Sequence, residues 1–459
     1  MRLLSLACAI ALGLSSVAAS AATPQPAAGT SIKSVPGSEA IVSKTLANGL
    51  KIIVWPDHDI PNANFYTFYK VGSRNEYPGI TGLAHYFEHM MFNGTTRRAP
   101  GAFDREMEAA GGSNNASTSN DLTIYTDWFP SGALETIFDL EGDRMANLAF
   151  DPKVVESERG VVYSERRSSV DNDNFGTLLE QMQATAFTAH PYQFPTIGWP
   201  SDIEHWKLDD LKKFFKTYYA PNNAVLVIAG DVDPAQVFAL ADKYLASLPK
   251  QPAPAPITTV EPEQLGERRL VVERSDAQSP IVAYAFHSGM GAGDKRLPAL
   301  ELLTTILSQG QSSRLHQRLV EREQAATQAG AFAEAGFDPG LLWVYAMLPP
   351  GGDMARVESL LDDELAKIAR DGVSADELAK ARNLKASAFW RGMATINGKA
   401  RALGTYEVFN GDYRKLFDAP SAYDAVSAAD VQALAKRILR IQNRTTGLLK
   451  PVAAKEAAK

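Results

Sequence analysis

Cysteine is almost absent from this chain, because Cys8 is the single one among its 459 residues. Beyond residue 8 there is therefore no thiol to oxidise and no disulfide. Later apolar runs all fall short of the roughly 20 residues that cross a bilayer, so we expect no stable membrane insertion. Charge of one dominant sign is also lacking, since a net charge of −7 arises from 46 basic and 53 acidic side chains. This mixture carries no signature of nucleic-acid binding.

The first 21 residues have the features of a signal peptide. Met1–Arg2 is a short charged start, Leu3–Leu14 is an apolar core, and Ala19–Ala21 provides a plausible A-x-A cleavage site. Cys8 lies inside this segment, but Ser5 stands where a lipoprotein site requires an aliphatic residue, so lipidation is disfavoured. We expect export to the periplasm, with secretion beyond it left open.

The remainder of the chain is too long for one typical hydrophobic core, which predicts two domains or more. A Pro- and Ala-rich stretch divides it nearly in half and should be extended. Both halves end with similar combinations of a helical pattern and an apolar strand, a weak indication of duplication. We place an N-terminal domain at 36–248, a linker at 249–266, a C-terminal domain at 267–452 and a tail at 453–459.

The most informative feature is the sequence His85-Tyr86-Phe87-Glu88-His89. Two histidines four positions apart on a helix project about 40° apart, so both imidazoles can reach one metal ion. Glu88 lies next to the second histidine, where a carboxylate that is not a ligand could accept a proton from metal-bound water. The order H-x-x-E-H is that of an inverzincin metallopeptidase. The alternative is a pair of ordinary surface or core histidines, and a third ligand would decide between the two.

A candidate third ligand lies in residues 151–167. Asp151 followed by Pro152 predicts a helix start, with Asp at the N-cap and Pro at the first helical position. Glu158 and Glu165 are seven positions apart and share one face of that helix. Without the histidines these glutamates would indicate only a solvated acidic face, whereas with them a carboxylate ligand is favoured.

The two segments together resemble the pitrilysin and mitochondrial-processing-peptidase family of zinc metallopeptidases, in which H-x-x-E-H is followed by E-x-x-x-x-x-x-E. The 76 positions from His89 to Glu165 fit the spacing of that family. The resemblance implies one Zn²⁺ per chain bound by His85, His89 and Glu165, with Glu88 as general base and Glu158 as an acidic residue that supports the ligands. It also implies an α+β fold of two homologous domains, each a mixed, mainly antiparallel sheet with helices, which form a half-chamber.

The segment between the motifs contains a candidate substrate site. Gly111–Thr118 precedes Leu122–Trp128, whose alternating residues, rich in β-branched and aromatic types, predict a strand. In the similar family an Asn-Ala pair at this place begins an edge strand, to which the substrate peptide adds by main-chain hydrogen bonds. Asn115 and Ala116 are therefore candidate substrate contacts. The alternative is a polar turn before a strand.

The second half departs from the family. Gly310–Leu315 matches a family segment, after which members with a complete active site carry an Arg and, seven residues later, a Tyr that reach the substrate carbonyl. An ungapped comparison puts Val320 and Thr327 at those positions, and neither can do that work. Arg322 and Tyr345 could replace the pair only in a shifted register. In family members made of two chains, one chain carries the zinc motif and the other carries the Arg and Tyr. We therefore expect a heterodimer in which a homologous partner subunit supplies these hydrogen-bond donors.

These features predict a zinc-dependent endopeptidase or oligopeptidase that hydrolyses unfolded peptides, with Glu88 activating zinc-bound water. The alternative is a non-catalytic scaffold or chaperone subunit of the same fold. Relatives of that kind usually lose the metal ligands, whereas all of them are present in this sequence.

Overall fold

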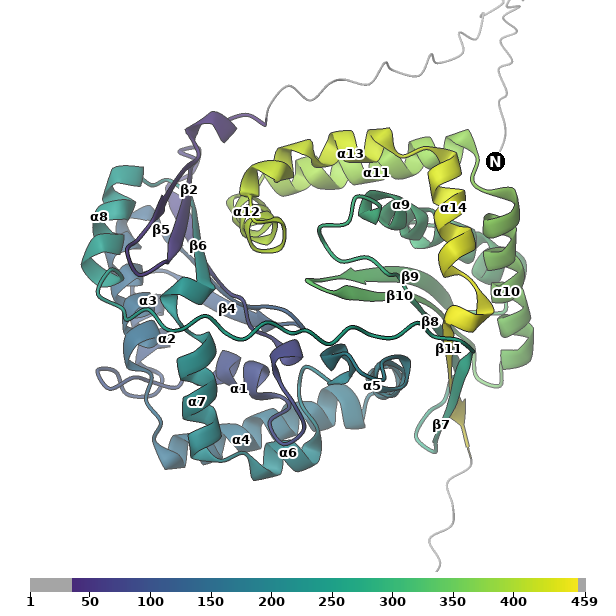
Figure 1. Ribbon diagram of the computed structural model, residues 1–459, viewed down its shortest axis with the longest axis horizontal. Helices are drawn as coiled ribbons and strands as arrows, with labels where there is room; N and C mark the ends of the chain where they lie inside the picture. The colour runs from purple at the N-terminus through teal and green to yellow at the C-terminus, as the bar shows by residue number, and fades with distance from the viewer. Residues whose placement is uncertain (1–34, 453–459) are drawn as a thin grey trace, which may run out of the picture.

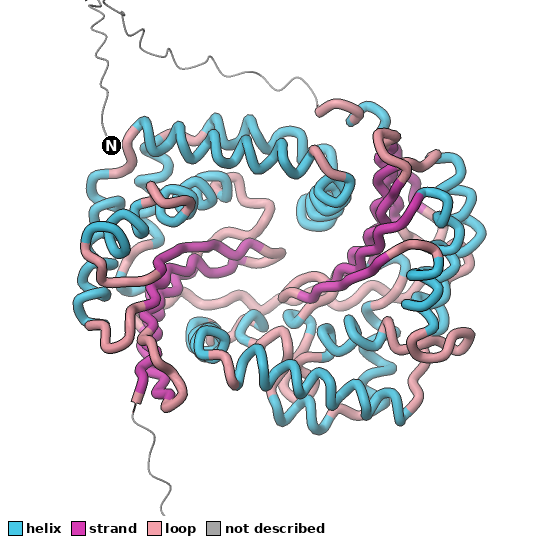
Figure 2. The backbone as a smooth tube through the Cα atoms, turned by 180° about the vertical axis from the view of Figure 1, so that it is seen from behind, coloured by secondary structure: helices cyan, strands magenta, loops and turns pink. Residues whose placement is uncertain are grey.

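The two halves of the chain fold into two β-sheets with helices packed on them. The computed structural model describes residues 35–452, so the predicted signal peptide and C-terminal tail lie outside the described residues. We call residues 35–248 the first half and residues 267–452 the second half. Figure 1 shows the first half on the left and the second on the right, and Figure 2 shows from behind that the two groups of strands converge near the middle of the molecule.

The first sheet has six strands in the order β1-β2-β6-β3-β5-β4. β2 and β6 run parallel, and every other neighbouring pair is antiparallel. β6 and β3 lie in the centre and are buried along nearly their whole length, as their long apolar runs require. The strands are β1 Val42–Thr45, β2 Lys51–Pro56, β3 Asn62–Tyr69, β4 Ser113–Thr118, β5 Thr123–Pro130 and β6 Ala224–Gly230.

The second sheet repeats this topology with one strand fewer. Its order is β7-β11-β8-β10-β9, with β7 and β11 parallel and the other pairs antiparallel. The order and directions equal those of β2-β6-β3-β5-β4, so the predicted duplication is confirmed. The strands are β7 Arg268–Arg274, β8 Ile281–His287, β9 Gln328–Ala335, β10 Pro339–Met347 and β11 Arg444–Pro451.

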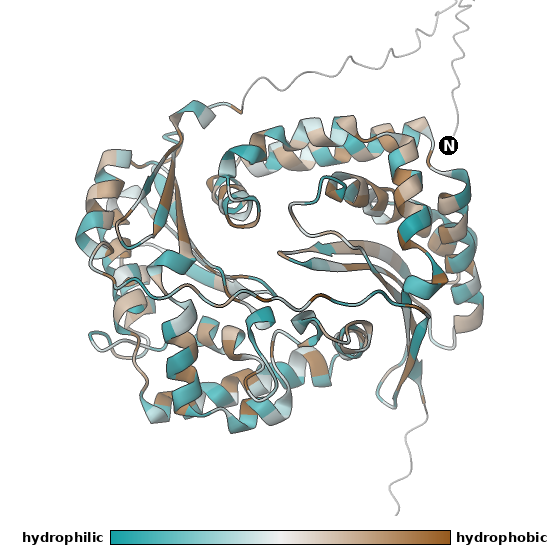
Figure 3. Cartoon of the chain, viewed as in Figure 1, coloured by the Kyte–Doolittle hydropathy of each residue, from teal (hydrophilic) through white to brown (hydrophobic). Residues whose placement is uncertain are grey.

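Each sheet packs one face against helices of its own half, which gives two large apolar cores. In α10 the buried residues Val357, Leu361, Leu365 and Ile368 recur every three or four positions, so one side of the helix is apolar. Figure 3 shows the resulting mixture of hydrophobic and hydrophilic segments along the helices. The helices are α1 Leu83–Met90, α2 Ala102–Ala109, α3 Leu134–Asn147, α4 Pro152–Arg166, α5 Asn174–Ala186, α6 Pro200–His205, α7 Leu208–Tyr218, α8 Pro234–Tyr244, α9 Leu297–Ser308, α10 Met354–Asp371, α11 Ala375–Met393, α12 Ile396–Asn410, α13 Ala419–Ala425 and α14 Ala428–Ile438.

The other face of each sheet is covered by a helix from the opposite half (Figure 1). α5 packs on the second sheet, and α12 packs on the first. Both contacts need a glycine, because a Cβ at Gly404 of α12 would collide with the ring of Phe68, and one at Gly447 of β11 would collide with Met182 of α5. A domain division at the linker therefore follows the two sheets but not every helix.

Residues 249–265 connect the halves without helix or strand, as the Pro- and Ala-rich composition predicts. Glu261 in this segment accepts hydrogen bonds from the backbone amides of Thr188, Ala189 and His190, at 2.8–2.9 Å. The connection is thereby fastened to the first half. Among the described residues, none of the helices combines the length and apolar character that crossing a membrane would require.

Candidate metal centre

The helix that carries the first motif, α1, is held at its N-terminus by a buried carboxylate. Glu76 accepts hydrogen bonds from the backbone amides of Gly82 and Ala84, both at 2.7 Å. Gly82 has φ +88°, and a Cβ there would lie 2.5 Å from the carbonyl oxygen of Ile197, so only glycine fits this start. Most apolar residues of α1 are buried, which directs the motif's polar side chains toward α4 and β4.

The second motif lies on α4, whose predicted start is confirmed. Asp151 is the N-cap and accepts a hydrogen bond from the amide of Lys153 at 2.7 Å, and Pro152 is the first helical residue. Glu165 lies near the C-terminal end of this helix and Glu158 about two turns before it. Both carboxylates face α1.

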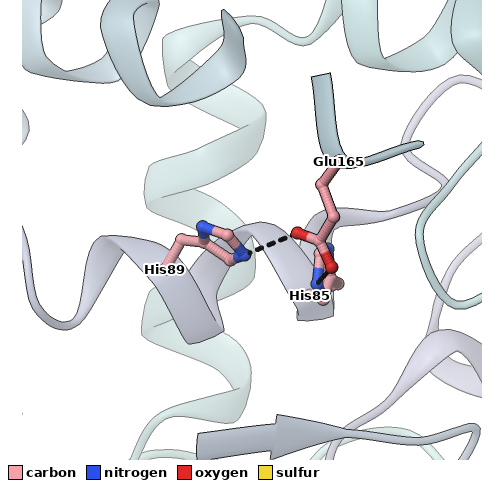
Figure 4. A group of neighbouring side chains, drawn as sticks. All are labelled: His85, His89 and Glu165. Carbon is pink, nitrogen blue, oxygen red and sulfur yellow. Dashed lines mark ion pairs between the residues drawn. The ribbon is translucent and has the colours of Figure 1, made fainter. Parts of the chain in front are cut away.

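Three side chains from α1 and α4 converge on one point (Figure 4). Nε2 of His85 lies 3.6 Å from Oε1 of Glu165, and Nε2 of His89 lies 3.2 Å from Oε2 of the same carboxylate. One ligand atom from each of the three residues lies within 4.8 Å of the others. Ligands about 2.1 Å from a tetrahedral zinc ion are about 3.4 Å apart, so the donor set and its spacing fit zinc. Among residues 35–452 this is the one such group of histidine, cysteine or acidic side chains.

Glu158 fixes the orientation of the second histidine. Its Oε1 lies 2.8 Å from Nδ1 of His89, and its Oε2 accepts a hydrogen bond from Asn93 at 2.7 Å. Asn93 also donates to the backbone carbonyl of His89 at 3.2 Å. A proton on Nδ1 would leave the Nε2 lone pair directed at Glu165 and available to a metal. Sequence reasoning missed Asn93, although its place four residues after His89 was a usable signal.

The charges of the group are coupled. Burial opposes a proton on His89, but the carboxylates of Glu158, Glu165 and Glu88 outweigh burial and raise the pKa of this imidazole. The hydrogen bond and charge of His85, with the charge of His89, hold the pKa of Glu165 below its ordinary value despite partial burial. Histidines and carboxylates thus compensate one another in the metal-free protein.

The proposed general base, Glu88, faces the end of the edge strand β4. Its Oε2 accepts a hydrogen bond of 2.6 Å from the hydroxyl of Thr118, the last residue of β4. A second link joins α1 to the same sheet, because the hydroxyl of Tyr125 in β5 donates to the carbonyl of Phe87 at 2.9 Å. Sequence reasoning did not identify Thr118, since nothing in the local pattern connects it with Glu88.

Asn115 and Ala116 lie in the middle of β4, opposite Thr126 and Tyr125 of β5. β4 is the edge of the first sheet, so within the described residues its outer side has no strand partner. The strand begins at Ser113, two residues before the predicted Asn-Ala start, and the alternative of a simple polar turn is wrong. An unpaired edge beside α1 can accept an extended peptide by main-chain pairing.

The residues compared with the family's Arg and Tyr lie in the second half. Val320 and Arg322 belong to the π-helical segment His316–Arg322, and the hydroxyl of Thr327 donates to a backbone carbonyl of β10 at 3.1 Å. The hydroxyl of Tyr345 accepts a hydrogen bond from Gln328 on β9 at 3.1 Å, and its ring packs on α5. The hydroxyl of Thr327 thus donates within the second sheet, whereas that of Tyr345 accepts there and keeps its own proton.

Comparisons with known proteins identify relatives of both halves of the chain. Residues 57–198 match the family model "Insulinase (Peptidase family M16)", and residues 205–385 match "Peptidase M16 inactive domain". The chain is 31% identical to the zinc protease PqqE of Helicobacter pylori over 89% of this chain and 92% of that protein. It is 29% identical to an uncharacterized zinc protease of Mycobacterium leprae over 94% of this chain and 96% of that protein.

Solved structures of two bacterial proteases have a similar fold. A protease from Helicobacter pylori superimposes with a TM-score of 0.86 at 30% identity, covering 90% of this chain and 99% of that one. The periplasmic protease PqqL from Escherichia coli has the same fold, with a TM-score of 0.74 at 19% identity, over 91% of this chain but 49% of its own. The family resemblance drawn from the sequence is confirmed, and this chain belongs to peptidase family M16.

Proposed function

We propose that this chain is a zinc-dependent endopeptidase or oligopeptidase that hydrolyses unfolded peptides. The observation that carries the proposal is the convergence of His85, His89 and Glu165, with Glu88 placed between that group and the end of an open edge strand. A metal group alone could be structural, and an edge strand alone could be accidental. Their adjacency is what peptide hydrolysis requires, because the scissile bond must lie beside both.

Each group in the site has a definable task. Zinc, when bound by His85, His89 and Glu165, would polarise the attacking water and the peptide carbonyl. Glu88 accepts the proton of that water and passes it to the leaving amine. Glu158 keeps His89 in the orientation and tautomer that a ligand needs. The main chain around Asn115 and Ala116 pairs with the substrate backbone, which selects extended peptides rather than a particular sequence.

The donors that would stabilise the developing oxyanion are assigned to a homologous partner subunit, so we propose a heterodimer. Val320 is apolar, and the hydroxyl of Thr327 already donates to the backbone carbonyl of Met347. An oxyanion donor is worth on the order of 3 kcal/mol, so a site without donors would be slow. The fold supports a second unit, since the structurally similar PqqL chain is about twice as long as the part that matches.

A non-catalytic scaffold subunit is the second candidate, and one observation favours it. The family model that matches residues 205–385 is described as an inactive domain. That description concerns the second half, whereas the convergent ligands lie in the first. Zinc content separates the candidates, because about one ion per purified chain supports the peptidase and none supports the scaffold.

The decisive experiment replaces Glu88 by Gln, which removes the base without removing a ligand. We expect about one zinc per chain, as in the wild type, and a loss of peptide hydrolysis of roughly 10²- to 10⁴-fold. Zinc is measured by elemental mass spectrometry and hydrolysis with an internally quenched peptide. Glu156→Gln on α4 is the matched control, because that carboxylate is 73% exposed and faces away from the site. Substantial turnover by Glu88→Gln would remove Glu88 from this role.

Partner dependence and location need separate tests. Purification from the native source, with mass spectrometry of co-purifying chains, should identify a homologue that raises the rate of the isolated chain. A single chain whose rate of hydrolysis is changed by no partner homologue would contradict the heterodimer.

We also propose export to the periplasm. The protein should then be recovered in the osmotic-shock fraction, without about its first 21 residues.

A further inference from the structure

Two equivalent hairpin turns, one from each half, meet tip to tip where the halves join (Figure 2). The first is Ser119–Leu122, between β4 and β5, and the second is Gly336–Asp338, between β9 and β10. The backbone amide of Phe337 donates to Asp121 at 3.3 Å. Gly336 allows this approach, because a Cβ there would collide with both the Asp121 carboxylate and the Tyr192 hydroxyl. The second half thus reaches the strand end that lies beside the metal centre.

Four side chains, Arg74, Asp121, Tyr192 and Asp338, fasten the two turns, and we call them the inter-half clasp. The hydroxyl of Tyr192 lies 2.8 and 2.9 Å from the two carboxylate oxygens of Asp121 and accepts from the amide of Asp338 at 3.2 Å. Arg74 lies 3.5 Å from Asp121 and 2.6 Å from Asp338, and it stacks on the ring of Phe337. Asp121 and Tyr192 are buried, so these bonds are shielded from water.

The first turn is held on its other side as well. The amide of Arg74 donates to the carbonyl of Asn120 at 2.9 Å, and the amide of Ser73 donates to the carbonyl of Ser119 at 3.3 Å. A Cβ at Gly72 would collide with the same two carbonyl groups, so this contact requires glycine. While these contacts and those of the inter-half clasp are formed, the backbone of the turn is restricted.

Thr118 immediately precedes this turn, and its hydroxyl donates to Oε2 of Glu88 at 2.6 Å. A glutamate side chain has three rotatable bonds, and a fixed donor restricts where its carboxylate lies. With Oε2 bonded to Thr118, Oε1 is the oxygen that can take up a proton. The position of Glu88 therefore depends on the position of the β4 end.

We propose that Thr118 is a positioning residue for Glu88 and that the inter-half clasp acts on catalysis through it. The inference rests on the proposed function, because it assumes that Glu88 moves the proton. It gives the second half, which has no metal group among its described residues, a definite contribution to the reaction. The second half holds the turn, the turn holds Thr118, and Thr118 holds the base.

The first test compares Thr118→Val, which removes the hydroxyl with little change in shape, with Thr118→Ser, which keeps it. In the assembly that hydrolyses peptide, we expect Thr118→Val to lower kcat about 10- to 100-fold while KM stays within about twofold and zinc content is unchanged. Thr118→Ser should recover most of kcat. Wild-type kcat in Thr118→Val, or equal losses in both variants, would overturn the positioning role.

The second test asks whether the clasp acts through Thr118. Tyr192→Phe removes only the hydroxyl that bridges Asp121 and Asp338, and we expect kcat to fall about fivefold. Combined with Thr118→Val, it should lower kcat no further, because the link is already broken. If the fold losses in kcat of Tyr192→Phe and Thr118→Val multiply in the double variant, the clasp does not act through Thr118. Glu407→Gln is the control, since its 2.7 Å ion pair with Lys51 joins the halves at β2, which β6 and β3 separate from the hairpin β4–β5. Its loss in kcat should multiply with that of Thr118→Val.

A third measurement needs neither zinc nor turnover. Hydrogen exchange of the zinc-free protein should show faster exchange of the Ser119–Leu122 amides in Tyr192→Phe than in wild type or Glu407→Gln. Unchanged exchange would overturn the claim that the clasp holds the turn. If Glu88→Gln is inactive and Thr118→Val is fully active, only this inference fails. If Glu88→Gln is active, the proposed function fails, whereas the exchange result still reports on the clasp.

Discussion

The two halves share a sheet topology but differ in what joins the helices beside the edge strand. In the first half α1 and α4 meet through His85, His89 and Glu165. In the second half α9 and α11 meet through a 3.0 Å ion pair between Glu301 and Lys385. The opposite charges of Lys385 and Glu301 neutralise each other. Two imidazoles and a carboxylate at ligand spacing are instead suited to binding a metal ion. Within the described residues, the same sheet topology occurs in both halves, whereas the group of candidate metal ligands occurs in the first half alone.

The edge strands differ in the same sense. β4 is polar, with the sequence Ser-Asn-Asn-Ala-Ser-Thr, and its last residue is bonded to Glu88. β9 is rich in alanine and has no corresponding acid–base partner in α9, which is mostly apolar and buried. Both halves thus have apolar packing positions, while the polar positions of α1 and β4, including the buried His85, carry the candidate site. The difference between the halves therefore concerns few side chains and can be tested by single substitutions.

The largest effect should come from removing one ligand. His85→Ala should abolish stoichiometric zinc binding and lower peptide hydrolysis at least about 10³-fold, because three protein ligands are needed to hold a catalytic zinc. The fold should survive, since the second half keeps its equivalent helix pair without a metal. Zinc content, hydrolysis and circular dichroism measure the three expectations. A well-folded variant that retains zinc and turnover would break the comparison.

Lys385→Met is the mirror-image control in the second half. It removes the ion pair with Glu301, whose side chains are 25% and 31% exposed, so a loss of at most about 1 kcal/mol in unfolding free energy is expected. Zinc content and hydrolysis should not change. A loss of zinc in Lys385→Met would show that the second pair is part of the metal centre.

Much of the site was predictable because its signals are local. The four-residue spacing of His85 and His89, the seven-residue spacing of Glu158 and Glu165, and the Asp-Pro helix start at Asp151 each depend on one turn or two of helix. The two-sheet architecture was also anticipated, from the linker and the family resemblance. These features need no knowledge of which distant segments meet.

The rest could not be predicted, because it depends on contacts between distant segments. Thr118 and Glu88 are 30 positions apart, and Tyr192 and Asp121 are 71 apart. The buried face of α12 includes Gly404 and Glu407 and is not a continuous apolar stripe, so its sequence does not show that this face covers the sheet of the other half. β4 lacks the apolar alternation of a strand, so its assignment came from the resemblance and not from its own residues.

The two helices that cover the sheet of the opposite half, α5 and α12, give the next prediction. Gly404→Ala should lower the unfolding free energy by about 2–3 kcal/mol, because the new Cβ meets the ring of Phe68 in a packed core. Gly447→Ala should cost less, about 1 kcal/mol, because the two nearest atoms that the new Cβ meets belong to the flexible side chain of Met182. Urea unfolding measures both. Gly392→Ala on α11, where a Cβ meets nothing within 4 Å, is the control and should stabilise slightly. Equal losses of unfolding free energy in Gly404→Ala and Gly447→Ala would mean that Phe68 and Met182 are equally unable to move aside.

The last comparison concerns the two turns of the clasp, whose carboxyls differ in burial. Burial raises the pKa of Asp121 to about 6, although Tyr192 and Arg74 favour its charged form and Asp338 opposes it. Between about pH 4 and 6 the folded protein therefore holds a proton that the unfolded chain has released, so stability should fall as pH rises through this window, by about 3 kcal/mol.

Asp121→Asn should remove that slope from a plot of Tm against pH, because the amide has no proton to lose in this range. The matched substitution in the other turn, Asp338→Asn, should leave the slope in place. Its side chain is 30% exposed, against 7% for Asp121, and burial is the main cause of the shift. A slope that persists in Asp121→Asn and disappears in Asp338→Asn would reverse the assignment. The second half would then contribute the titrating group as well as the contact that holds the first turn.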